Sequence, residues 1–359
     1  FVEKNGAAAP LTQSERQRIL QRNDEMAQDA MRVLALCWRR VSGSGDTAEQ
    51  NLVFCGLAGM IDPPRKEAYE AVAKCRRAGI RPVMITGDSR QTACAVAKEL
   101  HILTPGGELL TGEVLTGEQL NRMDEEAFAR VLPKVSVFAR VTPAHKLRIV
   151  KALKAQGNIV AMTGDGVNDA PAVKEANIGV SMGQNGTDVT KEASSVILLD
   201  DNFATLVSAV EEGRVIYRNI RKFIRYLLSC NIGEVVTMFL AMLMGMPVPL
   251  LPIQILLINL VTDGLPAIAL GLDPPDSDVM TEKPRRSGDS IFSGGLLTVI
   301  LFRGMLIGLT TIAVFSMLLT GGASLQTART GALAALILTQ LIHVFECKSE
   351  RRTLLHIPF

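Results

Sequence analysis

Two carboxylates follow a short apolar run near the middle of the chain. The run Asn158 to Ala161 leads into Met162 to Ala172, which reads Met-Thr-Gly-Asp-Gly-Val-Asn-Asp-Ala-Pro-Ala and contains Asp165 and Asp169. A strand that ends in a glycine turn places such carboxylates at the carboxyl edge of a parallel sheet, where open α/β sheets bind ligands. Mg²⁺ takes few protein ligands and shares its shell with water and phosphoryl oxygens. The stretch therefore indicates a Mg²⁺ and phosphate site, whereas a lone Asp-Gly turn would more often be structural.

Two further stretches carry residue types that suit phosphoryl transfer. Thr86 to Asp88 ends the apolar run Pro82 to Ile85, where a hydroxyl and a glycine amide can donate to phosphate oxygens. Lys146 follows Phe138 to Pro143 at the start of an expected helix, where its ammonium can neutralise phosphoryl charge. Alone, the first would equally be a helix cap, and the lysine would more often be an exposed helix residue. Their order along the chain favours phosphoryl-transfer chemistry.

The elements that must position these residues alternate between Leu52 and Asp201. Strands are expected over residues 53–60, 80–86, 135–141, 159–163, 178–182 and 195–199, and helices over 65–78, 92–100, 144–156 and 170–175. Such alternation predicts a parallel sheet with helices on both faces. Before it, residues 14–30 predict a polar helix, and a Ser-Gly loop at 42–46 follows the apolar run 33–38.

The composition changes beyond Arg225. Apolar runs at about residues 223–244, 250–270, 296–319 and 328–345 are each near the ~20 residues needed to cross a bilayer. Basic residues flank the spans on one side, namely Arg214, Arg218, Arg221, Lys222, Arg225, Lys283, Arg285, Arg286, Lys348, Arg351 and Arg352. The opposite loops, 245–249 and 320–327, contain no Lys or Arg. The positive-inside rule then predicts an integral, multi-pass membrane protein whose α/β domain and C-terminus are both cytoplasmic.

The overall composition fits a chain divided between a cytoplasmic and a membrane part. Of 359 residues, 48% are hydrophobic and 21% charged, with a formal net charge of +2. There is room for two or three domains. No long basic run suggests a nucleic-acid partner. The six cysteines show no metal-binding spacing and are expected to be reduced. Because Phe1 is not an initiator methionine, the sequence is expected to begin within a longer protein.

Polar and ionisable residues lie inside the first two spans. Asn231 and Glu234 are three residues apart and share one helical face. Asn259, Thr262 and Asp263 cluster before a Gly-Leu-Pro sequence that is able to interrupt the helix. Buried carboxylates are costly and functional by default, and broken helices often form cation sites. Polar contacts between helices would explain Asn231 or Thr262 alone. Oxygen ligands favour a hard cation, Ca²⁺ before Zn²⁺ or Cu⁺.

Five stretches resemble, in order and approximate spacing, the P-type ATPases, which are ion pumps of the haloacid-dehalogenase superfamily. They are Asp62 to Arg65, Met84 to Asp88, Phe138 to Pro143, Met162 to Ala172 and Glu211 to Arg214. The resemblance implies a haloacid-dehalogenase-like α/β domain with a Rossmann-type parallel sheet and an all-α transmembrane helix bundle. Residues 1–50 would end a nucleotide-binding domain, 51–215 would form the phosphorylation domain, and 216–359 would form the transmembrane domain.

The resemblance also implies roles for individual residues. Asp165 would hold Mg²⁺, and Asn168 and Asp169 would order the phosphorylation site. Thr86 and Lys146 match residues that contact the aspartyl phosphate. The residues implied near ATP are Arg32, Thr86, Gly87, Asp88, Arg140 and Lys146.

The membrane stretches Ser229 to Glu234 and Asn259 to Ala267 resemble calcium pumps of the sarco/endoplasmic-reticulum type. Sodium/potassium pumps have Asp where Asn259 stands. The implied ligands of the transported Ca²⁺ are Asn231, Glu234, Asn259, Thr262 and Asp263. Gln340 stands where that calcium pump has a ligand Glu, which favours one Ca²⁺ per ATP with proton counter-transport through Glu234. Mn²⁺, or Na⁺ with H⁺, is the alternative cargo.

The family phosphorylates the Asp of an Asp-Lys-Thr-Gly-Thr sequence, which does not occur between Phe1 and Phe359. It is expected upstream, in the remaining part of a pump that acts as a monomer in the lipid of a bacterial cell membrane or an endomembrane. Two alternatives remain open. A membrane-tethered phosphatase would need Asp276 as its nucleophile, and a non-catalytic membrane fragment would need none. Thr111 to Glu113 and Thr116 to Glu118 imitate a dephosphorylation motif of the family but are expected to be turn and cap residues.

Overall fold

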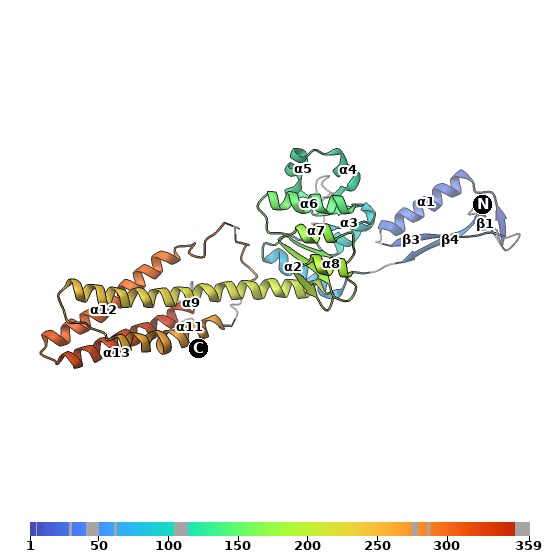
Figure 1. The fold of residues 1–359 in the computed structure, drawn as a ribbon. Helices are drawn as coiled ribbons and strands as arrows, with labels where there is room; N and C mark the ends of the chain where they lie inside the picture. Colours follow the sequence, from blue (N-terminus) through green and yellow to red (C-terminus); the bar gives the residue numbers. More distant parts are fainter. Residues whose placement is uncertain are drawn as a thin grey trace. The chain divides into compact units, whose positions relative to one another are not determined.

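The computed structural model describes residues 1–4, 6–28, 31–40, 50–60, 63–103, 114–274, 279–285 and 288–348 of the chain (Figure 1). The chain divides into two compact units, one of residues 1–208 with 280–287, the other of residues 209–279 with 288–359. Several sequence-based expectations concern residues outside the described ranges, namely Asp29, Ala30, the loop 42–46, Asp62, Thr111 to Glu113, Asp276 to Asp278, Arg286, Arg351 and Arg352. The structure describes all six cysteines, and none of them forms a disulfide.

A four-stranded sheet occupies the N-terminal part of the chain. Its order is β2 (Ala7–Ala9), β1 (Val2–Lys4), β4 (Val53–Met60) and β3 (Arg32–Trp38), and helix α1 spans Gln13–Gln28. β4 was expected to open the parallel sheet, and this expectation is wrong. β4 pairs antiparallel with β3 and parallel with β1. The physical reason is that two apolar runs of similar length satisfy each other's backbone along seven residue pairs, and this pairing outweighs sequence order.

Two parallel three-stranded sheets form the α/β part. The first has the order β5 (Met84–Ile85), β7 (Val137–Ala139), β6 (Val114–Thr116), and the second β10 (Val196–Leu198), β9 (Ile178–Met182), β8 (Ala161–Gly164). Every pair in these sheets is parallel, as predicted. A single continuous sheet was the expectation, whereas β5 and β8 are each an edge strand of their own sheet.

Helix α6 (Pro143–Ala155) packs against side chains of both sheets. Its Ile149 belongs to one buried cluster with Phe138, and its Val150 belongs to another with Met162. Ile85 of β5 contacts both clusters. The other helices of this part are α2 (Lys66–Arg77), α3 (Arg90–Glu99), α4 (Gly117–Arg122), α5 (Glu125–Val131), α7 (Ala170–Glu175) and α8 (Asp188–Ala193), with the short 3₁₀ helix η1 at Leu132–Lys134. The carboxyl ends of β5 and β8 are therefore attached to one shared core.

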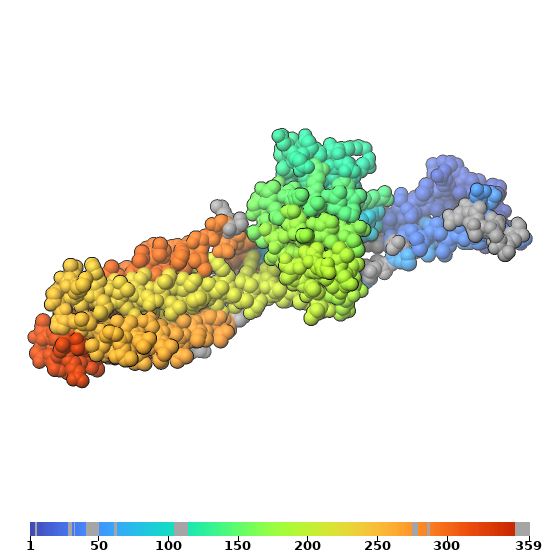
Figure 2. All heavy atoms as spheres, in the orientation of Figure 1, coloured from blue at the N-terminus to red at the C-terminus, as the bar shows by residue number. Residues whose placement is uncertain are grey.

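The second unit consists mainly of apolar helices, whose atoms are coloured yellow to red in Figure 2. Four helical stretches among the described residues are long and apolar enough to cross a membrane. They are α9 (Phe203–Leu243), α10 to α11 (Pro252–Gly271), α12 (Leu296–Thr320) and α13 (Leu325–Cys347). Each of the four predicted spans thus overlaps one of these helical stretches. α9 begins at Phe203, thirteen residues before residue 216, where the transmembrane domain was expected to begin, and its 41 residues correspond to about 60 Å at 1.5 Å per residue.

Helices α9 and α12 touch through glycines. A Cβ atom on Gly304 would lie 2.5 Å from Cγ2 of Ile232, and one on Gly308 would lie 2.6 Å from Cγ1 of Val236. Small residues four apart let two membrane helices approach closely enough for extensive van der Waals contact. The separation of α9 and α12 therefore depends on these glycines.

Gly304→Ala is expected to destabilise the membrane unit by about 1–3 kcal/mol, because the added methyl group overpacks a filled contact. Gly213→Ala in α9 is the matched control, since a Cβ there meets nothing within 4 Å. This control should be neutral or stabilising by up to about 1 kcal/mol through helix propensity. Thermal unfolding of the detergent-solubilised protein measures both. Equal unfolding temperatures for the two variants would contradict the tight contact.

Candidate phosphoryl-transfer and cation sites

The loop after β5 is folded on itself and bound to the segment after β7. The Thr86 hydroxyl donates to Oδ2 of Asp88 at 2.7 Å, and the Asp88 amide donates back to Oγ1 of Thr86 at 3.1 Å. The amide of Arg140, a residue with φ of +50°, donates to the Asp88 carbonyl. Gly87 lies at the exposed tip, where a Cβ would meet nothing within 4 Å. Gly87 thus faces open space, and the Thr86 hydroxyl would bind a phosphate oxygen by turning away from Asp88.

An ion pair joins α6 to the loop after β8. Nζ of Lys146 lies 2.5 Å from Oδ1 of Asp169, whose residue is 6% exposed. The Gly166 amide donates to the other oxygen of this carboxylate at 3.4 Å. Gly164 is required here, because a Cβ would lie 2.4 Å from Cβ of Asp169. The pair brings the carboxyl ends of the two parallel sheets together at residues that the sequence singled out.

Asp165 and Asn168 lie on the outside of the same loop. Both residues are exposed, and neither side chain has a hydrogen-bond partner among the residues that the structure describes. The Asp165 carbonyl accepts a hydrogen bond from the Thr187 amide at 2.9 Å. Within the described ranges, no group of three or more His, Cys, Asp or Glu side chains could hold a metal ion. A single available carboxylate fits Mg²⁺, which completes its shell with water and phosphate, and does not fit a metal enclosed by protein ligands.

Arg32 is not brought to this site by any described contact. Its backbone begins β3, where it pairs with Met60. Its side chain lies outside what the structure describes.

His145 fixes the helix that carries Lys146. Its Nδ1 accepts a hydrogen bond from the Thr142 amide at 3.1 Å, so the ring proton is on Nε2, which donates to Oδ1 of Asn121 at 2.7 Å. Acceptance at Nδ1 requires a neutral imidazole. Burial, with a smaller contribution from Arg148, lowers the pKa of His145 below its ordinary value of 6.5.

The protein is therefore expected to lose stability below pH 6.5. The unfolded chain protonates His145 first, so its contribution is complete above pH 6.5 and declines as the pH falls toward the lowered pKa of the folded state. The measurement compares unfolding temperatures at pH 7.5 and 5.5 for the parent and for His145→Gln, in which the decline should be smaller. His101→Asn, at an exposed histidine, should keep the full decline. An unchanged decline in His145→Gln would refute this contribution.

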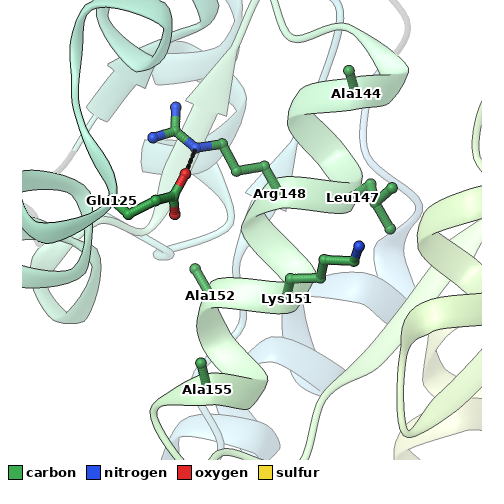
Figure 3. Close-up of a pocket in the computed structure, with 7 residues that line it drawn as sticks. All are labelled: Glu125, Ala144, Leu147, Arg148, Lys151, Ala152 and Ala155. Atoms are coloured by element: carbon green, nitrogen blue, oxygen red, sulfur yellow. Dashed lines mark hydrogen bonds and ion pairs between the residues drawn. The ribbon is translucent and has the colours of Figure 1, made fainter.

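A shallow hollow of the first unit lies beside α6. It has a volume of about 390 Å³ and is lined by α6 residues and Glu125 (Figure 3). Arg148 already forms an ion pair there, because its Nε donates to Oε1 of Glu125 at 2.9 Å. None of the predicted site residues lines this hollow. The predicted phosphoryl-transfer residues therefore lie outside this hollow, at the open edge where Lys146 meets Asp169.

In the membrane unit, Glu234 receives two amide donors. Nδ2 of Asn259 donates to its Oε2, and Nε2 of Gln340 donates to its Oε1, each at 3.3 Å. Asp263 is 1% exposed, and its Oδ1 accepts from the Tyr226 hydroxyl at 3.1 Å. Carboxylate and amide oxygens from α9, the second span and α13 thus gather within one bundle.

Two buried acceptors of this cluster have no partner. Oδ2 of Asp263 and Oε1 of Gln340 are buried without a hydrogen-bond donor among the described residues. A buried acceptor without a donor costs about 1–3 kcal/mol. A hard cation bonded to such an oxygen would offset that cost, so the donor set fits Ca²⁺ chemically.

The second span is interrupted one turn earlier than expected. Residues Ile258–Asp263 form a π-helical segment, η2, between α10 (Pro252–Leu257) and α11 (Gly264–Gly271). Gly264 to Pro266, expected to interrupt the span, continues as α helix, because Asp263 and Gly264 keep helical dihedral angles. Pro266 has no N–H to donate to the Thr262 carbonyl four residues before it, and this carbonyl accepts from the Tyr226 hydroxyl at 3.0 Å. π turns often occur at functional sites.

Some predicted ligands lie together and others do not. Glu234 and Asn259 are in contact, whereas Asn231 is exposed and has no side-chain partner among the described residues. Thr262 takes part through its carbonyl and not through its hydroxyl. The sequence-based ligand set missed Tyr226, whereas Gln340 had been singled out at the position of a ligand Glu. The signal that the sequence offered for Tyr226 was its spacing, since Cys230 follows it by four residues and Glu234 follows Cys230 by four. In the structure all three residues are buried.

Comparison with known proteins agrees with both halves of this geometry. Residues 5–177 match the family of haloacid dehalogenase-like hydrolases, and residues 247–359 match the C-terminus of cation transporting ATPases.

The relatives compared individually are all named calcium-transporting ATPases. A calcium-transporting ATPase of Bacillus subtilis is 52% identical over 93% of the chain and 38% of its own length. Calcium-transporting ATPase 1 of Lactococcus lactis is 42% identical over 99% of the chain and 40% of its own length. The endoplasmic reticulum-type calcium-transporting ATPase 4 of Arabidopsis thaliana is 44% identical over 87% of the chain and 31% of its own length. The chain thus spans about two fifths of the length of such relatives, or less. Together with the parallel sheets, the Lys146–Asp169 edge and the four apolar helices, these matches establish that the chain belongs to the cation-transporting P-type ATPases.

Proposed function

We propose that the chain is part of a pump that uses ATP to move Ca²⁺ across a membrane. The observation that carries this proposal is the pair of donorless buried oxygens on Asp263 and Gln340, beside Glu234. Two carboxylates within apolar helices, whose hydrogen-bond partners among the described residues include neither Lys nor Arg, favour a cation as their counter-charge. The names of the relatives support Ca²⁺ as that cation.

The phosphoryl group is held by residues of the open edge. The γ-phosphoryl of ATP passes to a carboxylate oxygen of an aspartate, forming an acyl phosphate and releasing ADP. Lys146 balances the charge of the transferring group, and Thr86 donates to its oxygens. Mg²⁺ on Asp165 would supply further positive charge. Asn168 and Asp169 hold the surrounding loop, while Gly87, Asp88 and Arg140 shape the approach of ATP. Arg32 would contact the nucleotide.

The phosphorylated aspartate is contributed by another segment of the pump. β5 and β8 are edge strands, and Ile85 and Val160 next to these edges share both buried clusters. A strand between them would satisfy both edges and would place its carboxyl end beside Lys146. This segment is therefore the chain's principal protein partner, and the pump works as a monomer.

The cation site supports one Ca²⁺ per ATP. Gln340 is uncharged, so Glu234 and Asp263 are the two carboxylates among the proposed cation ligands. Asn259, Thr262 and Asn231 add neutral oxygens, Asn231 after a rotation of its side chain. Glu234 exchanges its proton as Ca²⁺ leaves, which gives counter-transport. Mn²⁺ competes because its oxygen coordination is similar.

The pump is embedded in the lipid of a cell membrane or endomembrane, with the α/β unit on the cytoplasmic side. Loops rich in Lys and Arg at the ends of the spans support this orientation.

Reconstitution tests the proposal. The intact pump in lipid vesicles should accumulate radioactive Ca²⁺ when ATP and Mg²⁺ are outside, with one Ca²⁺ per ATP hydrolysed. Two Ca²⁺ per ATP would refute the stoichiometry alone. Uptake of Mn²⁺ or Na⁺ without Ca²⁺ would refute the cargo, and ATP-independent uptake would refute the pump.

A further inference from the structure

Asp201 lies between β10 and α9 in a backbone conformation that few side chains adopt. Its φ is +50°, and the residue is 9% exposed. A residue other than glycine in this region is strained and persists when surrounding contacts determine it. The same contacts, first the Gln184 amide and then the Asn185 amide, lower the pKa of the Asp201 carboxyl below 3.8. Asp201 is therefore ionised at neutral pH.

The contacts of Asp201 come from the loop after β9. Its Oδ1 accepts from the Gln184 amide at 3.0 Å, and its Oδ2 accepts from the Asn185 amide at 2.9 Å and from Nδ2 of Asn185 at 2.8 Å. Three hydrogen bonds to one charged carboxylate are strong contacts. They bind the loop of residues 183–187 to the start of the membrane-directed helix.

The far end of the same loop is bound to the Mg²⁺ candidate. The Thr187 amide donates to the Asp165 carbonyl at 2.9 Å, and the Thr190 hydroxyl donates to the Gly166 carbonyl at 2.8 Å. The loop packs closely between its two ends, because a Cβ on Gly186 would lie 1.9 Å from the Met182 carbonyl oxygen. Hydrogen bonds at both ends of this packed loop offer a route by which a displacement of Asp165 could reach Asp201.

Asp200 provides a natural comparison. Its Oδ1 accepts from the Asn202 amide, and its Oδ2 accepts from the Thr205 hydroxyl at 2.5 Å. These contacts lie within the start of α9 and do not reach the loop. Two adjacent carboxylates therefore differ in one respect, since Asp201 connects two segments and Asp200 stabilises one.

We propose that Asp201 is a positioning residue that links the Mg²⁺-binding loop to the first turn of α9. α9 starts two residues after Asp201 and continues without interruption to Glu234. A change of state at Asp165 then biases the helix that carries a cation ligand. This role rests on the proposed function, and it adds to that function a residue that contacts neither phosphate nor cation.

The test uses the intact pump with Asp201→Asn and Asp200→Asn. Asn tolerates a positive φ, so the exchange removes the charge without adding backbone strain. Asp201→Asn should lower the number of Ca²⁺ ions transported per ATP at least three-fold, while the amount phosphorylated by ATP stays within two-fold of the parent. Asp200→Asn should leave both unchanged. Asn185→Asp, which places a like charge against Asp201 from an exposed position, should reproduce the drop even if Asp201→Asn folds poorly.

Hydrogen exchange gives a readout apart from activity. Mg²⁺ with beryllium fluoride, a mimic of the phosphorylated state, should change amide exchange over residues 203–208 in the parent and in Asp200→Asn. Asp201→Asn and Asn185→Asp should lose this response. A retained response, or an unchanged number of ions per ATP in both variants, would overturn the link. A parent pump without Ca²⁺ transport would refute the proposed function, and the exchange response would still decide the role of Asp201.

Discussion

Lys146→Met is expected to lower phosphorylation of the intact pump by ATP about 100-fold. A fixed positive group aimed at developing charge typically contributes a factor of this size to the rate. Lys146 is the cation within 2.5 Å of the buried Asp169 carboxylate, where the two sheet edges meet. The measurement is the initial rate at which radioactive phosphate from ATP becomes bound to the protein.

Two controls separate this chemistry from folding. Lys146→Met leaves the buried Asp169 charge without its ion pair, which costs on the order of 3 kcal/mol. The double variant Lys146→Met with Asp169→Asn removes that charge and should recover stability without recovering phosphorylation. Lys151→Met, on the exposed face of the same helix, should behave as the parent (Figure 3). Recovery of phosphorylation in the double variant would show that Lys146 acts through stability alone.

Asp263→Asn is expected to raise the Ca²⁺ concentration for half-maximal phosphorylation at least ten-fold, equivalent to about 1.4 kcal/mol of binding free energy. Asn keeps the shape of the side chain and an acceptor for the Tyr226 hydroxyl, so the packing of α9 against η2 is preserved. The charge and the second anionic oxygen are lost. Because the site is buried, water does not replace them.

The control for this variant is Asp289→Asn, an exposed carboxylate in the loop before α12. It should leave the calcium dependence unchanged. Calcium dependence equal to that of the parent in Asp263→Asn would remove Asp263 from the cation site. Size-exclusion chromatography measures the amount of folded protein. It therefore separates a loss of folded protein from a shift in the half-maximal Ca²⁺ concentration.

Local patterns predicted the elements that depend on nearby residues. Strand Ile178–Met182 and helix Ala170–Glu175 have the expected bounds, because an apolar run between two turns, or a proline in a first helical turn, fixes them locally. The strand expected over residues 80–86 is shorter in the structure, Met84–Ile85, because β7 is its one hydrogen-bonded neighbour among the described strands.

Contacts between distant residues were not predictable in this way. Pairing of β4 with β3 and β1 decides which sheet β4 joins, and periodicity carries no information on the partner. β6 has three residues and gives no periodic signal. Gln340 reaches Glu234 across 106 residues, and the π turn η2 depends on packing around Tyr226. Short motifs therefore located the chemistry, and long-range packing completed the cation site.

The dependence of phosphorylation on calcium tests the central claim most directly. The intact pump is incubated with radioactive ATP and Mg²⁺ at Ca²⁺ concentrations from below 10⁻⁸ to 10⁻⁴ M, a span on the order of known protein affinities. We expect an acid-stable, hydroxylamine-sensitive phosphoenzyme that forms as Ca²⁺ is added and is absent when Ca²⁺ is chelated. Phosphorylation of equal extent with and without Ca²⁺ would contradict the coupling of the phosphoryl-transfer edge to Glu234 and Asp263.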